Sequence, residues 1–172
     1  MATTTFKKSN QAHAPNIDLT YDSSSIPGGC PAGTIVKGYD NYNIPNQLVL
    51  CKVGTGGWSA GHCLVLTAPS GVLTATKVGA NALLSSTAPQ AGIGFGVNDA
   101  TATNYAWVQI SGYVVDAVMA SSESHVAGEA VITSGTAGAL DDWDGSSTTK
   151  IVPRCIAAES ATSATIDLLL NI

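Results

Sequence analysis

The residues best suited to metal binding or nucleophilic chemistry are four cysteines and a histidine that adjoins one of them. They are Cys30, Cys51, His62, Cys63 and Cys155. Zinc sites usually place paired ligands two to four residues apart, whereas the first three cysteines are separated by twenty-one and twelve positions. A Cys–His nucleophile pair would have to form in space, because no residue pattern requires one. We therefore expect neither a metal site nor a covalent catalytic site, and no cofactor.

The even number of cysteines leaves their pairing open. The N-terminus, MATTTFKKSNQ, has no apolar segment typical of a secretory signal, and disulfides are rare in chains that fold in a reducing cytoplasm. We expect all four thiols to be reduced on folding, with free cysteines packing as small apolar side chains. A late bridge from Cys30 to Cys51 or Cys63 remains an alternative. No apolar run approaches the length of a transmembrane helix.

Two stretches match ligand-binding loops only in part. The acidic segment Asp141-Asp142-Trp143-Asp144-Gly145 would need ligands at positions one and twelve of a calcium loop, but those positions hold Leu140 and Ile151. A surface turn is the better interpretation. The glycine-rich segment 54–61 lacks the Lys-Ser/Thr of a phosphate loop, and the glycines at 92–96 have no surrounding βαβ unit. We therefore expect no nucleotide site.

Three tryptophans are the remaining candidates for binding. Trp58, Trp107 and Trp143 would suit a sugar-stacking platform, or would serve as anchors of a core or of an interface between chains. The second interpretation is favoured, and a carbohydrate-binding domain remains an alternative.

Composition limits the class of partner. Charged residues make up only 11 % of the 172 residues, and the formal net charge is −5. The seven basic residues are scattered apart from Lys7-Lys8, which argues against nucleic acid as a partner because phosphate binding needs clustered cations. A surface rich in Ser, Thr and Ala is cheap to desolvate, which suits a protein packed against other chains.

The elements that must position these residues are short strands. Residues 106–115, AWVQISGYVV, alternate with period two and contain β-branched and aromatic side chains, until Gly112 marks a bulge or bend. Similar runs occur at 34–37, 47–53, 62–67, 71–78, 93–97, 130–133, 150–157 and 165–170, with Gly/Ser/Thr/Asp turns between them. This spacing predicts an all-β fold, a small β-barrel or sandwich of β-tulip type. Pro153 suggests that its strand lies at an edge.

Residues 1–27 differ from the all-β body expected over residues 28–172. They are polar, with Pro15 and Pro27 disfavouring helix, and we expect an extended N-terminal arm. The isolated apolar residues Phe6, Ile17, Leu19 and Tyr21 are candidate contacts with a partner, and residues 17–21 alternate as an added strand would. A frayed terminus is the alternative.

The second half of the chain resembles a known family. The runs GFGVNDATATNYAWVQISGYVVDAV, AGEAVITSGTAGALDD and IVPRCIAAESATSATIDLLL, within residues 92–172, are similar to head decoration (capsid cement) proteins of tailed bacteriophages. The resemblance implies a structural virion protein without enzymatic activity. Such a protein binds the exterior of a capsid built from a major capsid protein of the HK97 type, is assembled in the host cytoplasm, and often forms a homotrimer. A head or tail fibre base is the alternative within the virion.

Trp107 is the fifth candidate interface residue. In the strand at 106–115 it faces away from Val108 and Ile110, so both faces of that strand carry apolar side chains. We expect Val108 and Ile110 in the domain core and Trp107 against a partner chain. The opposite assignment, with Trp107 in the core, is the alternative.

Overall fold

The computed structural model describes residues 7–8, 30–39, 43–79, 90–143 and 151–171. Strand accounts for 62 % of the structure and helix for 2 %, so the predicted all-β class is confirmed. The strands are β1 (Lys7–Lys8), β2 (Ile35–Tyr39), β3 (Pro45–Val53), β4 (Cys63–Thr67), β5 (Thr74–Lys77), β6 (Gln90–Gly96), β7 (Tyr105–His125), β8 (Ala130–Thr133), β9 (Leu140–Asp142), β10 (Ile151–Ala157) and β11 (Ala161–Leu170). A single 3-10 turn among the described residues, η2 (Pro69–Gly71), joins β4 to β5.

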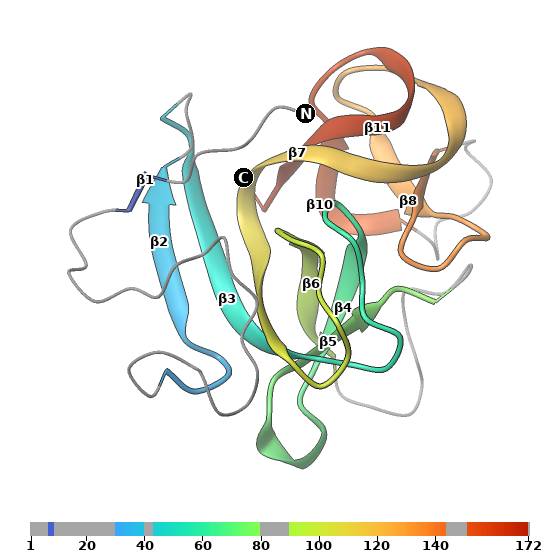
Figure 1. The fold of residues 1–172 in the computed structure, drawn as a ribbon. Coiled ribbons are helices and arrows are strands. Elements are labelled where there is room, and N and C mark those ends of the chain that lie inside the picture. Colours follow the sequence, from blue (N-terminus) through green and yellow to red (C-terminus); the bar gives the residue numbers. More distant parts are fainter. Residues whose placement is uncertain (1–6, 9–29, 40–42, 80–89, 144–150, 172) are drawn as a thin grey trace.

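Within the described ranges, all eleven strands belong to one sheet, which does not close into a single barrel (Figure 1). Instead the sheet returns to β7 twice. Strand pairings run through β3, β5, β4, β6 and β7 and back to β3, and again through β7, β11, β10, β8 and β9 and back to β7. We call β1–β6 with residues 105–111 of β7 the first lobe. The second lobe comprises residues 112–125 of β7 with β8–β11.

Gly112 marks the passage of β7 from one lobe to the other. Up to Ser111 the strand pairs with β3, and from Gly112 onward it pairs with β11. Gly112 has φ +101°, and a Cβ there would collide with the side-chain oxygen of Asn46 and lie 2.6 Å from the carbonyl oxygen of Pro45. The Asn46 oxygen accepts a hydrogen bond from the Tyr113 amide at 3.0 Å. The bend that the sequence suggests is therefore present, while the strand itself continues to His125.

Three apolar clusters follow from the period-two alternation of the strands. One lies in the first lobe and includes Val49, Leu64 and Val108. The largest joins second-lobe residues such as Ile166 and Leu168 to first-lobe residues from the opposite face of β4 and from β6: Cys63, Val65 and Phe95. The third lies on the other face of β3 and β7 and is formed by Val36, Leu48, Leu50 and Trp107. Because the largest cluster draws on both lobes, the lobes are packed as one body.

Two local expectations are wrong. Pro153 does not mark an edge, because β10 has β8 on one side and β11 on the other. The ladder with β8 is interrupted between Ile151 and Ile156, so the missing amide hydrogen of Pro153 falls in this irregular part. Asp141 and Asp142 belong to β9 and pair with Ile132 and Val131, so they lie in a strand and not in a surface turn.

Candidate functional site

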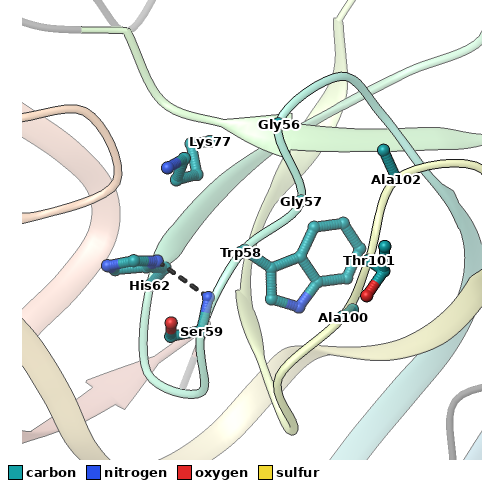
Figure 2. A pocket seen from close by; sticks show the side chains of 9 residues that line it. All are labelled: Gly56, Gly57, Trp58, Ser59, His62, Lys77, Ala100, Thr101 and Ala102. Carbon is teal, nitrogen blue, oxygen red and sulfur yellow. Dashed lines mark hydrogen bonds between the residues drawn. The ribbon is translucent and has the colours of Figure 1, made fainter.

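A surface pocket of about 430 Å3 lies beside the glycine-rich loop between β3 and β4 (Figure 2). Its walls are Gly56, Gly57, Trp58, Ser59, His62, Lys77 and the turn formed by Ala100, Thr101 and Ala102. Trp58 and Ala100 exchange two backbone hydrogen bonds of 3.0 and 2.9 Å, which fix the loop against this turn. Gly57 has φ +57°, and a Cβ there would collide with the Ala100 carbonyl oxygen, so a larger residue is excluded.

The ionisable side chains of the pocket are His62 and Lys77. The Ser59 amide donates a hydrogen bond of 3.0 Å to His62 Nδ1 (Figure 2). Burial lowers the pKa of His62, the nearby Lys77 lowers it further, and Asp99 opposes both. The imidazole is therefore held in its neutral form, with Nδ1 as an acceptor and the proton on Nε2. A Cβ at Gly138 would lie 2.9 Å from Lys77 and 3.2 Å from His62, so the glycine allows both side chains to pack there.

This arrangement does not form a Ser–His nucleophile pair. Activation of Ser59 would require its hydroxyl to donate to a ring nitrogen of His62, and Nδ1 already accepts from the Ser59 backbone amide. Asp99, which would orient a histidine in a catalytic triad, instead accepts a hydrogen bond of 2.9 Å from the Ala60 amide. What the pocket offers is the lysine of β5 beside a neutral imidazole on a loop fixed by the Trp58–Ala100 hydrogen bonds.

The tryptophans do not form a platform for sugar rings. Trp58 is 5 % exposed, and its indole packs against Gly96, where a Cβ would lie 2.6 Å from Nε1. Trp107 is 0 % exposed, and only Trp143, at 42 %, presents much of its surface to solvent. Stacking of a sugar needs an open ring face, so Trp58 and Trp107 are unsuited to the carbohydrate-binding alternative.

The expected role of Trp107 as an interface residue is wrong. Its side chain is fully buried within the chain, in the cluster with Val36, Leu48 and Leu50, and it lies directly opposite Leu50 on β3. Val108 on the other face is also fully buried. Alternation along the strand therefore separated two faces correctly, but both are covered by this chain. Period two does not reveal what covers a face, because the covering residues are distant in sequence.

The other candidate interface residues, Phe6, Ile17, Leu19 and Tyr21, lie outside the described residues. Between them in the expected arm, Lys7 and Lys8 form β1, which pairs antiparallel with β2: Lys7 lies opposite Tyr39 and Lys8 opposite Gly38.

All four cysteines carry free thiols. Burial raises the pKa of Cys51 and of Cys155 to about 12. Burial also raises the pKa of Cys63, and the proximity of Cys155 adds to the effect. These thiols are therefore protonated at neutral pH and poor nucleophiles. Cys30 is partly exposed.

Within residues 7–8, 30–39, 43–79, 90–143 and 151–171, no three His, Cys, Asp or Glu side chains are grouped so as to hold a metal ion. Of the acidic stretch, Asp144 and Gly145 fall outside these ranges. The described part of the chain also contains no helix long and apolar enough to cross a membrane.

One exposed surface was missed by the sequence analysis. Along β2, Ile35, Lys37 and Tyr39 point to one face, and Ile35 and Tyr39 are 48 % and 47 % exposed. Val36, between them, faces the third cluster. The signal was present in the alternation of Ile-Val-Lys-Gly-Tyr, but alternation alone does not show which face is open. A scan against known protein families and a search of curated proteins find no match for this chain.

Proposed function

We propose that this chain is a structural virion protein that binds the outer surface of a tailed-bacteriophage capsid and stabilises it as a decoration, or cement, protein. The observation that carries the proposal is the residue pattern of positions 92–172, which resembles that family. These residues contribute most of β6, all of β7 and the four strands that complete the second lobe. The partner would be the major capsid protein, and the protein would act as a homotrimer without enzymatic activity.

Two physical features support a binding role through broad surfaces. The low content of charged residues, 11 %, keeps the cost of desolvating a large area small. The largest apolar cluster joins both lobes, which makes the body rigid, and a rigid body loses little entropy when it is fixed between capsid subunits.

Purified virions of the phage that encodes this chain test the proposal. We expect the chain to be present in a copy number comparable to that of the major capsid protein, to be accessible to antibody on intact particles, and to rebind particles from which it has been removed. Particles without it should rupture at a lower temperature. Absence from the virion, or a position inside the shell, would refute the proposal. If the chain is found only at the neck or tail, the fibre-base alternative is correct.

A further inference from the structure

The charges of this chain are divided between its two halves. Residues 1–79 contain five lysines and three aspartates, a formal charge of +2, whereas residues 80–172 contain nine acidic and two basic residues, a formal charge of −7. The basic residues that appear scattered in the sequence are thus collected by the fold. Lys7 and Lys8 lie on β1, Lys37 on β2 and Lys52 on β3, and these three strands are neighbours in the sheet (Figure 1).

The exposed face of β2 combines positive charge with apolar side chains. Ile35 and Tyr39, each nearly half exposed, flank the exposed Lys37 on the same face. Lys7 and Lys8 lie in the neighbouring strand, opposite Tyr39 and Gly38. We call Ile35, Lys37 and Tyr39, with β1 beside them, the β2 face. Aromatic residues are enriched at the centre of a protein interface, and polar residues form its rim.

The second lobe presents the opposite charge. On its outer side, hydrogen bonds link Asp116, Glu159 and Asp167: the Asp167 carboxylate accepts from the Asp116 amide at 3.0 Å, and the Asp167 amide donates to the Glu159 carboxylate at 3.2 Å. The Tyr113 hydroxyl donates to Asp167 at 2.5 Å. Among the described residues from 112 onward, loops included, Arg154 is the only lysine or arginine, against seven acidic residues.

We propose that the β2 face of one copy docks on the acidic second lobe of another copy. The occupant is a second copy because the chain itself carries the complementary charge, while a β2 face placed against another β2 face would set lysine against lysine. Ile35 and Tyr39 would be buried at the centre, and the charges would set the orientation and speed the encounter. Because the two surfaces differ, the contact is heterologous, and its repetition closes into a ring when the rotation allows.

This contact would supply the self-association that the proposed decoration function assumes, but it is a property of the free protein. Its test therefore needs no capsid. If the protein does not bind capsids, the contact between copies can still be observed in solution. If the copies do not associate, the protein can still bind capsids.

Sedimentation velocity of the purified chain and of charge-reversal variants, below and well above physiological ionic strength, tests the proposal. We expect the unmodified protein to associate at low salt and to dissociate as salt is raised. Lys37→Glu and Glu159→Lys should each weaken association by roughly tenfold or more. The double variant restores complementary charge between the two surfaces and should recover most of the association.

Lys52→Glu is the matched control. Lys52 is exposed on the neighbouring strand β3 and carries the same charge as Lys37. Gln47 of β3 pairs with Lys37 and so shares its face. Lys52 is an odd number of residues from Gln47 and therefore lies on the opposite face of the sheet. This variant should associate like the unmodified protein. Melting temperatures of all four variants exclude unfolding as the cause of a loss.

Three results would overturn the proposal. The first is that the unmodified protein remains monomeric at every salt concentration. The second is that the double variant fails to recover association. The third is that Lys52→Glu weakens association as much as Lys37→Glu. If Lys37→Glu abolishes binding to capsids while association between copies is unchanged, the β2 face contacts the shell and not a second copy.

Discussion

Replacement of Trp107 by alanine should destabilise the fold itself and not merely weaken contacts with partners. Its indole is 0 % exposed and packs among Val36, Leu48 and Leu50. Truncation of a buried tryptophan costs about 3–5 kcal/mol, because transfer energy is lost and a cavity is left. For a chain of 172 residues, each kcal/mol lowers the melting temperature by about 2–4 °C, so the total shift is about 6–20 °C.

Trp107→Phe provides the matched comparison. Among the described residues, Trp107 Nε1 is buried and has no hydrogen-bond partner, so phenylalanine removes volume without breaking a polar contact. We expect a loss of about 1–2 kcal/mol for this variant. Thermal unfolding followed by circular dichroism measures both variants. If Trp107→Ala melts at the unmodified temperature but loses association in sedimentation, Trp107 is an interface residue and the packing described above is incorrect.

Three further predictions concern the glycine bend, the thiols and the pocket histidine. Gly112→Ala should lower the free energy of unfolding, measured in urea, by about 2–4 kcal/mol, because φ +101° disfavours any side chain and the new Cβ would displace Asn46. Gly128→Ala is the control, because Gly128 also has a positive φ but has open space around it. An equal loss in this control would show that only φ matters. A thiol reagent at neutral pH should label Cys30 rapidly. It should label the three buried cysteines only on unfolding, because burial raises the pKa values of their thiols. Rapid labelling of all four cysteines would contradict the burial of these three. The pKa of His62 is lower in the folded protein than in the unfolded chain, so the unfolded chain binds this proton first and stability should decrease as pH falls through 6.5. His62→Gln should flatten this part of the plot of stability against pH. An unchanged plot would show that other groups cause the pH dependence.

The all-β class and most strands could be predicted because period-two alternation and turn residues are local signals. The hairpin between β4 and β5, the closing strand β11 and the bend at Gly112 all follow from such signals. The full length of β7 could not be predicted, because its second half runs through Ala-Ser-Ser-Glu-Ser, a segment with poor strand propensity, and pairs with β11 about forty residues later.

The candidate surfaces were harder to predict than the strands. The prediction that Trp107 lies at an interface was wrong, because the residues that pack on its indole, such as Val36, lie about seventy positions earlier in the sequence. The grouping of lysines was missed for the same reason: Lys7 and Lys8 come to lie beside the strand that carries Lys37 only when β1 pairs with β2. Charge patterning is visible in a sequence, but its arrangement on a surface depends on topology.

The sharing of β7 between the lobes has a consequence for folding. No linker separates the two halves of β7, because Ser111, the last residue that pairs with β3, is followed directly by Gly112, the first that pairs with β11. The largest apolar cluster draws on both lobes. Neither lobe can therefore unfold without exposing part of this shared core, and the two lobes should melt in one cooperative transition. The ladders of β7 also join distant parts of the chain, so contact order is high and folding should take milliseconds to seconds. The second lobe cannot close until β11, at the C-terminal end, has been synthesised.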